Sequence, residues 1–220
     1  MTIQRTVLIY SGGMDSTVLL YYLRSRGHEV LPLGINYGQR HAKELLAGEE
    51  ICRGLGLEYR VASLEALQPF LKGSSQTDSG VPVPHGHYAA ENMKVTVVPN
   101  RNMLMLSVAI AHAISSKAEH VAYAAHRGDH AIYPDCRPEF VQAMQVAAML
   151  CDWSPVRLIA PLVNMTKADL ASVGAEMGVP FEKTWSCYEG SAVHCGKCGT
   201  CVERKEAFDL AGVPDPTVYA

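Results

Sequence analysis

The sequence predicts a single α/β domain built on a parallel sheet, with a small metal-binding lobe towards its C-terminal end. Short apolar, often β-branched runs alternate along most of the chain with segments whose apolar residues recur at helical spacing, a pattern typical of parallel sheets. Four cysteines crowd between residues 187 and 201 and predict the lobe. A chain of 220 residues, 48% of them hydrophobic, can bury one sizeable core.

The first part of the chain alternates strands with helices. Residues 6–10 form an apolar, β-branched run followed by two glycines, which predicts a buried strand. The next predicted elements are a helix over 15–26 that stops at Gly27, a strand over 30–35, a helix over 41–55 and a strand over 58–62. Strands that alternate with helices in this way are parallel and joined by right-handed crossovers.

A long segment over 63–99, rich in Gly, Pro, Ser and Asp, interrupts this alternation. Loops of this length are uncommon inside compact domains and are often functional. The alternation resumes with helices over 102–117, 138–151 and 167–177, strands over 120–124 and 156–159, and a short last helix over 202–210. We therefore expect an α/β domain over residues 1–180 and a four-cysteine lobe with a terminal helix over 181–220.

The segment Ser11-Gly12-Gly13-Met14-Asp15-Ser16-Thr17 lies between the first strand and the first helix. Its glycines let the backbone turn tightly and approach a ligand, and the helix that follows offers unpaired N–H groups to an anion. Open parallel sheets also bind ligands at the carboxyl ends of their strands. The segment therefore predicts a site for nucleotide phosphates. The alternative is an ordinary Ser-Gly-Gly turn, with Asp15 at the start of a helix for local reasons.

This segment is neither a Walker A loop nor a dinucleotide-binding Gly-x-Gly-x-x-Gly. It resembles the S-G-G-x-D-S signature of the PP-loop ATPases, which split ATP into AMP and pyrophosphate on a Rossmann-like sheet of the adenine nucleotide alpha hydrolase type. The resemblance implies an ATP-binding site made by Tyr10, Ser11, Gly12, Gly13, Met14, Asp15, Ser16 and Thr17.

The same resemblance implies the catalytic residues Asp15, Ser16 and Lys167. Asp15 would help to place Mg²⁺. Lys167 begins the helix after the last strand, where PP-loop enzymes carry a lysine that holds the ATP phosphates. Without the family match, a solvated surface lysine explains Lys167 equally well.

The cysteines follow the pattern Cys187-x7-Cys195-x2-Cys198-x2-Cys201. Four thiolates at this spacing suit a tetrahedral zinc ion, and because they leave no position open for water we expect the zinc to be structural. An iron–sulfur cluster is the main alternative. Two other cysteines, Cys52 and Cys151, lie in helical apolar patterns and are expected in the core.

Arg101 lies just before a predicted helix, in Val98-Pro99-Asn100-Arg101-Asn102. Its planar guanidinium suits a carboxylate or a phosphate. The alternative is that this stretch only starts the helix, with Asn102 as its N-cap and Arg101 on the surface.

A denser polar segment, 126–140, follows a strand at the carboxyl edge of the sheet. Asp129 or Asp135 can accept hydrogen bonds from an amidine-like edge such as that of guanine, and Tyr133 can stack on a ring. The alternative is a polar loop that caps the next helix through Asp135, with Pro138 in the first turn. Cys136 has no neighbouring base in the sequence that would make it a nucleophile.

Together these segments resemble the 7-cyano-7-deazaguanine synthase family of queuosine biosynthesis over about the whole chain. The most specific matches are Tyr133-Pro134-Asp135-Cys136-Arg137 and the four-cysteine pattern. The resemblance implies a carbon–nitrogen ligase that uses ATP to convert 7-carboxy-7-deazaguanine and ammonia into the nitrile, preQ0, through an adenylated acid and an amide. It also implies that the deazaguanine is bound by Arg101, Asp129, Tyr133, Asp135 and Arg137.

Composition narrows the class of partner. The net charge is −3 and the 19 Lys and Arg form no run, which disfavours a nucleic-acid substrate. No apolar stretch is long enough to span a membrane, and no charged-then-apolar leader begins at Met1, so we expect a cytoplasmic protein that uses small-molecule substrates. The apolar content and the family likeness suggest a homodimer.

Three other functions stay open at this stage. One is a PP-loop enzyme that thiolates tRNA, which would need a basic face and a sulfur-carrying cysteine. Another is a non-catalytic zinc module on a degenerate nucleotide-binding domain, although the residues of the 11–16 loop are all present. The third is a relative that couples the deazaguanine acid to another amine.

Overall fold

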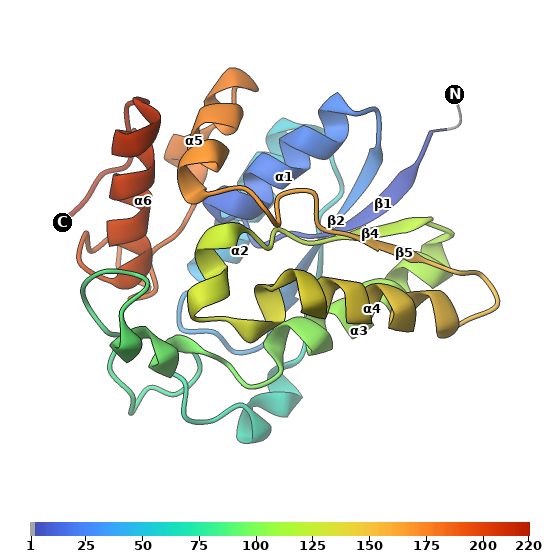
Figure 1. Cartoon of the computed structure of the whole chain (residues 1–220), viewed down its shortest axis with the longest axis horizontal. Helices are drawn as coiled ribbons and strands as arrows, with labels where there is room; N and C mark the ends of the chain where they lie inside the picture. Colours follow the sequence, from blue (N-terminus) through green and yellow to red (C-terminus); the bar gives the residue numbers. More distant parts are fainter. Residues whose placement is uncertain (1–2) are drawn as a thin grey trace.

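The computed structural model describes residues 3–220, so the expectation about Met1 and the start of the 1–180 domain lie outside the described residues. Its centre is a five-stranded sheet in the order β3-β2-β1-β4-β5, with every pair parallel (Figure 1). The strands are Arg5–Ile9 (β1), Glu29–Asn36 (β2), Arg60–Ser63 (β3), His120–Ala122 (β4) and Arg157–Ile159 (β5). The predicted Rossmann-like sheet is confirmed.

Helices cover both faces of this sheet. They are Met14–Ser25 (α1), Lys43–Gly54 (α2), Arg101–Ser116 (α3), Pro138–Leu150 (α4), Lys167–Glu176 (α5) and Gly199–Ala211 (α6). Alternate residues of β1 point to opposite faces: Val7 and Ile9 pack with α3 and α4, whereas Leu8 packs with α1 and α5. Because both faces are buried, β1 is apolar throughout. Helix α6 lies beside α5, at the edge of the molecule (Figure 1).

The order of the strands creates a crevice between β1 and β4. After β1 the chain adds β2 and β3 on one side, and it then returns to place β4 and β5 on the other side. The connections that leave the carboxyl ends of β1 and β4 therefore diverge, and open parallel sheets bind ligands at such a point. The segments over 11–17 and 126–137 both begin there.

The order and type of the predicted elements are confirmed, and their ends differ from the prediction by at most three residues. Some local expectations are wrong. Asn102 is not the N-cap of α3, because that position belongs to Asn100, and Asp135 is not the N-cap of α4, because that position belongs to Arg137. Instead, Asp135 Oδ2 accepts the Asn102 amide at 3.2 Å, in the first turn of α3. Cys151 is exposed at the end of α4 rather than buried.

The long segment over 63–99 is an ordered part of the fold. It contains two short 3-10 helices, Glu65–Phe70 and Glu91–Thr96. Ser74 and Gln76 are fully buried between them, and the Ser74 hydroxyl donates to the Thr96 carbonyl at 3.1 Å. Loops this long that are packed by their own polar groups are often functional, as the sequence predicts.

The cysteine-bearing C-terminal region packs into the main core. Phe208 of α6 lies edge-on against Phe181, with their ring centroids 4.9 Å apart, in the same cluster as residues of α1 and α5. Arg204 is fully buried and donates to the Thr184 hydroxyl at 2.8 Å and to the Phe181 carbonyl at 2.9 Å. Of these contacts, only those within the shared apolar cluster join residues on both sides of position 180. The division into domains 1–180 and 181–220 stays a prediction.

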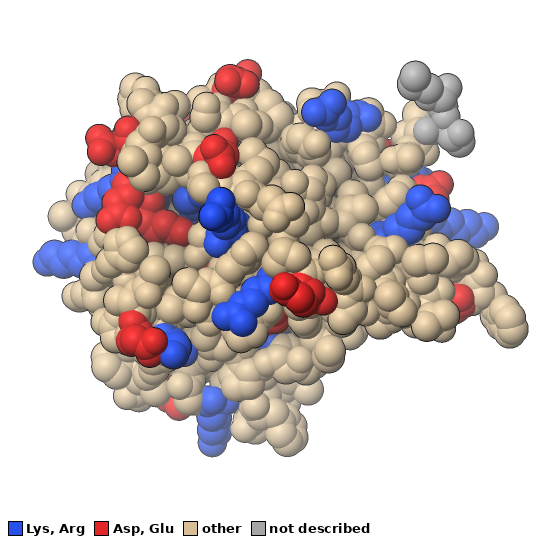
Figure 2. Space-filling model, viewed as in Figure 1, with Lys and Arg blue, Asp and Glu red and all other residues tan. Residues whose placement is uncertain are grey.

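The surface mixes charges of both signs. On the face drawn in Figure 2, Lys and Arg side chains lie scattered among Asp and Glu, and they gather into no broad basic area on that face. Over residues 3–220, none of the helices has both the length and the apolar character that crossing a membrane requires.

We expect Phe208→Ala to lower the free energy of unfolding by about 3–5 kcal/mol, because it empties a fully enclosed position in the shared core. The matched control is Leu210→Ala on the exposed side of the same helix, which should change stability by less than about 0.5 kcal/mol. Urea unfolding followed by circular dichroism measures both. A separate early transition, with the main one unmoved, would instead indicate an independent C-terminal domain.

Candidate functional site

The loop after β1 turns at Gly12, whose φ is +81°. A Cβ at this position would lie 2.3 Å from the Glu44 carbonyl oxygen and 2.3 Å from the Gly48 nitrogen, both in the backbone of α2, so a larger residue cannot fit. On its other side, the Gly12 carbonyl accepts the Trp185 amide at 3.0 Å. The loop is thereby held between α2 and the segment that leads to the cysteines.

Helix α1 begins directly after this loop, at the N-cap Gly13, without a side-chain cap. Over the described residues, the amides of Met14, Asp15 and Ser16 donate to no protein group. The Thr17 hydroxyl turns inwards and donates to the Gly13 carbonyl at 2.7 Å. Free N–H groups at the positive end of a helix form a site for an anion such as phosphate.

A cluster of charged side chains from several elements lies beside these amides. Lys167 Nζ, at the start of α5, is 2.7 Å from Asp15 Oδ2 and 3.2 Å from Glu203 Oε2 of α6. His126 Nε2 lies 3.4 Å from Lys167 Nζ and 3.4 Å from Asp129 Oδ2. The structure thus brings Asp15 and Lys167 together, as the sequence predicts, and adds Glu203 from the cysteine-bearing helix.

The pKa values in this cluster follow from burial and from the neighbouring charges. Burial alone would raise the pKa of Asp15, but Lys167 and His126 outweigh it, and the pKa lies below its usual value. Burial lowers the pKa of Lys167, but Asp15 and Glu203 outweigh it, and the pKa is raised. The Lys167–Asp15 pair therefore stays charged at neutral pH, and Lys167 offers a fixed positive charge next to the free amides.

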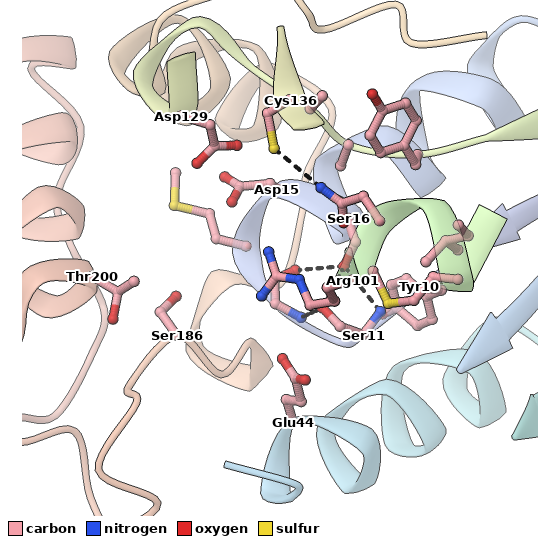
Figure 3. Close-up of a pocket in the computed structure, with 18 of the residues that line it drawn as sticks. Tyr10, Ser11, Asp15, Ser16, Glu44, Arg101, Asp129, Cys136, Ser186 and Thr200 are labelled. Atoms are coloured by element: carbon pink, nitrogen blue, oxygen red, sulfur yellow. Dashed lines mark hydrogen bonds between the residues drawn. The ribbon is translucent and has the colours of Figure 1, made fainter. Parts of the chain in front are cut away.

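A cavity opens at the carboxyl edge of the sheet, next to the free amides of α1. Its volume is about 200 Å³, below the range of about 300–1,000 Å³ that is usual for ligand sites. Figure 3 shows Ser11 and Asp15 around the start of α1, Arg101 near the centre, Asp129 on one side and Glu44 on the opposite wall. The 11–17 loop, the start of α2, the start of α3 and the 126–137 segment therefore line one cavity.

Most of the predicted ATP-binding residues line the cavity. The lining includes Tyr10, Ser11, Gly13, Met14, Asp15, Ser16, Arg101, Asp129 and Lys167. Gly12 and Thr17 are buried and do not line the cavity themselves.

Among the predicted substrate-binding residues, Arg101 lines the cavity and has no charged partner within the described residues. Its Nη1 donates to Gln76 Oε1 at 3.1 Å, and its guanidinium carbon lies 5.6 Å from the centroid of the Tyr133 ring. Within residues 3–220 it forms no ion pair with a carboxylate. A positive charge in the cavity without an anionic partner is suited to an anionic ligand.

Three of the predicted deazaguanine-binding residues are not part of the cavity lining. Tyr133 is 2% exposed, and its hydroxyl is 2.6 Å from Thr96 Oγ1. Asp135 accepts from the first turn of α3, and the exposed Arg137 donates from Nε to the His130 carbonyl at 2.8 Å. Direct contact between these side chains and a substrate stays a prediction.

Several lining residues escape sequence reasoning. Tyr37, His41 and Glu44 follow β2, and Tyr88 comes from the 63–99 segment. The Tyr88 hydroxyl donates to Asp129 Oδ1 at 2.9 Å. The sequence does carry a signal for the three residues after β2: they are polar and follow a strand at the same carboxyl edge of the sheet as the 11–17 loop.

Cys136 lines the cavity but lacks the surroundings of a nucleophile. Its sulfur lies 3.3 Å from the Asn102 side-chain amide. Burial raises the pKa of its thiol well above the usual value, and Asp129 and Asp135 raise it further. The protonated thiol is therefore favoured, in line with the sequence-based view that Cys136 is no nucleophile.

The four cysteines of the C-terminal pattern converge on one point. The sulfurs of Cys187, Cys195, Cys198 and Cys201 all lie within 4.8 Å of one another. Cys195 and Cys201 are 3.9 Å apart, close to the spacing of about 3.8 Å that a tetrahedral ion with metal–sulfur bonds of about 2.3 Å requires. The cluster is thus positioned to hold a metal ion. The neighbouring His194 accepts the Ser186 amide at 3.1 Å and is not part of the group.

The fold of the chain resembles solved structures of two synthetases. It matches an NMN synthetase from Francisella tularensis with a TM-score of 0.53 and 16% identity, covering 95% of this chain and 77% of that one. It also matches a 4-thiouridine synthetase, solved in complex with RNA and bound ATP, with a TM-score of 0.52 and 17% identity, over 95% of this chain and 52% of that one. At such identity the likeness supports the fold alone.

Sequence relatives are much closer. A protein named 7-cyano-7-deazaguanine synthase from Hahella chejuensis is 51% identical over 98% of this chain and 93% of its own length. A protein of the same name from Methanoregula boonei is 50% identical over 98% of this chain and 99% of its own length. The family model described as queuosine biosynthesis protein QueC matches residues 5–212. The chain therefore belongs to the QueC family.

Proposed function

We propose that this chain is an ATP-dependent ligase that converts 7-carboxy-7-deazaguanine and ammonia into 7-cyano-7-deazaguanine. The observation that carries the proposal is the cavity that joins the free amides of α1 and Lys167 to the unpaired Arg101. One end suits phosphates and the centre suits a second anion. Relatives that are about half identical over nearly their whole length carry the name of this activity.

In this proposal the phosphate end holds ATP. The 10–17 segment binds the nucleotide, with Asp15, Ser16 and Lys167 as the catalytic residues. Asp15 Oδ1 is a buried atom without a hydrogen-bond partner within the described residues, which fits a divalent cation beside it. When bound, Mg²⁺ would offset the charge of the phosphates. Glu203 and His126 act through Lys167 and Asp15, whose side chains they hold in position.

The reaction proceeds in two activations. The substrate carboxylate, oriented by Arg101, attacks the α-phosphate of ATP and forms the acyl-adenylate, with release of pyrophosphate. Ammonia attacks the acyl carbon, AMP leaves, and the amide and a proton remain. The amide oxygen then attacks the α-phosphate of a second ATP, pyrophosphate leaves, and loss of AMP and two protons gives the nitrile. Lys167 and the α1 amides stabilise the phosphate charge, which is the main contribution a protein makes to such chemistry.

The alternatives carry less support. A tRNA-thiolating activity would follow the 4-thiouridine synthetase, which is only 17% identical. Figure 2 supports a small-molecule substrate rather than a nucleic acid, because Lys and Arg lie among acidic residues on the face drawn.

We also infer a cytoplasmic location, since four cysteines that serve as metal ligands need a reducing compartment.

Incubation of the protein with 7-carboxy-7-deazaguanine, ATP, Mg²⁺ and ammonium tests the proposal. We expect mass spectrometry to detect the nitrile, with AMP and pyrophosphate as the other products. Lys167→Met should lower kcat by about 10²–10³, because it removes a fixed charge beside the reacting phosphates.

The matched control for this prediction is Lys72→Met, a change to an exposed lysine outside the cavity, which should leave kcat unchanged. A failure of the wild-type protein to make the nitrile would contradict the proposed function. Release of ADP and phosphate would contradict the mechanism through an adenylate, while leaving the overall conversion intact.

We propose that the cysteine cluster holds a structural zinc ion, because four thiolates fill a tetrahedral shell without an open position. Elemental analysis should find about one zinc per chain in the wild type. Cys198→Ser should reduce this content and lower Tm, whereas Cys151→Ser, at an exposed cysteine outside the cluster, should change neither. Iron together with inorganic sulfide in the purified protein would count against zinc.

We also propose a homodimer that pairs through the C-terminal part of α4. Val146, Met149 and Leu150 are exposed there, and the nearby Trp153 is fully exposed. Exposed apolar side chains that gather in one area often mark an interaction surface. Light scattering after gel filtration should give twice the mass of one chain, and Leu150→Glu should shift it towards one chain. Exposed Leu46 on α2 provides the control Leu46→Glu.

A further inference from the structure

Glu44 lines the cavity, but the proposed binding of ATP gives its carboxylate no role. It lies in the first turn of α2, and its side chain is 12% exposed. Figure 3 shows its carboxylate directed from α2 into the cavity, towards Ser11 and Arg101. Burying a carboxylate in this way is costly unless a partner compensates it, so its surroundings indicate what it is for.

Two other carboxylates of the described residues line the cavity, and both have strong partners. Asp15 is paired with Lys167 at 2.7 Å. Asp129 accepts from the Tyr88 hydroxyl at 2.9 Å and lies 3.4 Å from His126. One oxygen of Asp15 and both oxygens of Asp129 thus have neighbouring side chains as partners.

Glu44, by contrast, has only neutral partners. Its Oε1 accepts from the Gln39 side-chain amide at 3.2 Å, and the Ser11 hydroxyl also reaches it. His41 Nε2 lies 3.5 Å away, but burial lowers the pKa of His41 to about 3, so the ring is neutral at pH 7. Burial raises the pKa of Glu44 to about 7, and the charge of Arg101 acts against this rise. The hydrogen-bond partners of Glu44 are thus neutral, and the positive charge that acts on it is that of Arg101.

A ligand with two parallel N–H donors would satisfy such a carboxylate. The six-membered ring of a guanine-type base presents N1–H and the 2-amino group side by side, and the two oxygens of a carboxylate accept from both. Adenine presents a donor next to an acceptor, and a carboxylate repels that acceptor. The guanine edge is therefore the better match for Glu44.

Arg101 supplies the complementary contact. In Figure 3 its side chain lies above that of Glu44, and it forms no ion pair with a carboxylate in the described part of the chain. A 7-carboxy-7-deazaguanine carries its carboxylate on the five-membered ring and its N–H donors on the six-membered ring. One end of this molecule suits an arginine, and the other suits a glutamate.

We propose that Glu44 reads the base, accepting hydrogen bonds from N1–H and the 2-amino group while Arg101 binds the carboxylate. The inference rests on the proposed function and names a specificity-determining residue for it. It assigns base recognition to α2 instead of Asp129 or Asp135, since Asp129 is engaged by Tyr88 and Asp135 does not line the cavity.

Steady-state kinetics in which 7-carboxy-7-deazaguanine and ATP are varied in turn test this assignment. Glu44→Gln keeps the size of the side chain but replaces one acceptor by a donor. We expect it to raise KM for 7-carboxy-7-deazaguanine by about 5- to 150-fold, the range for losing a bidentate base contact, and to leave KM for ATP within about twofold, since the nucleotide contacts stay in place. Glu49→Gln, at an exposed position of the same helix, is the matched control and should change neither constant.

A second measurement needs no variant. The wild-type protein should use an analogue that lacks the 2-amino group with kcat/KM reduced by at least about tenfold, since one donor to Glu44 is missing. Equal use of the analogue, or a Glu44→Gln variant that raises KM for ATP alone, would overturn the assignment. Because both experiments require a wild-type protein that makes the nitrile, they separate this inference from the proposed function.

Discussion

The contact between the backbone of Gly12 and the backbone of α2 is the constraint on which the site depends. No side chain fits between them, so the loop after β1 and the first turns of α2 must pack at one fixed distance. The same glycine accepts the Trp185 amide and so ties in the segment before the cysteines. One residue without a side chain thereby sets the relative positions of three parts of the cavity wall.

The buried charges around Lys167 depend on one another in a similar way. Lys167 compensates Asp15 and Glu203, and removing one partner of such a buried pair leaves an uncompensated charge that costs about 3–5 kcal/mol. Since Glu203 belongs to the helix that begins at the cysteine cluster, its side chain is a second link, beside the Trp185 amide, between the cluster and the phosphate end. The C-terminal region is therefore part of the site and more than a support for it.

Sequence patterns predicted the sheet, the helices and the phosphate end, because a strand, a glycine turn and a helix start are neighbours in the chain. They did not predict Glu44 or Glu203, which reach the cavity only through the packing of α2 and α6. Local capping preference also misplaced Asn102, since Asp135, a distant residue, satisfies its amide. Cys151 follows the apolar period of α4, but periodicity alone does not tell whether the last turn of a helix is covered.

The spread of the site along the chain has a consequence for biosynthesis. Its groups run from Ser11 to Glu203, so the ribosome makes the first of them nearly 200 residues before the last. At about 5–20 residues per second this interval is roughly 10–40 s. During that time the nascent chain holds Asp15 without Lys167, and then this pair without Glu203. The full set of paired charges thus exists only after residue 203 has been made, and the growing polypeptide lacks the compensation of Lys167 by both carboxylates until then.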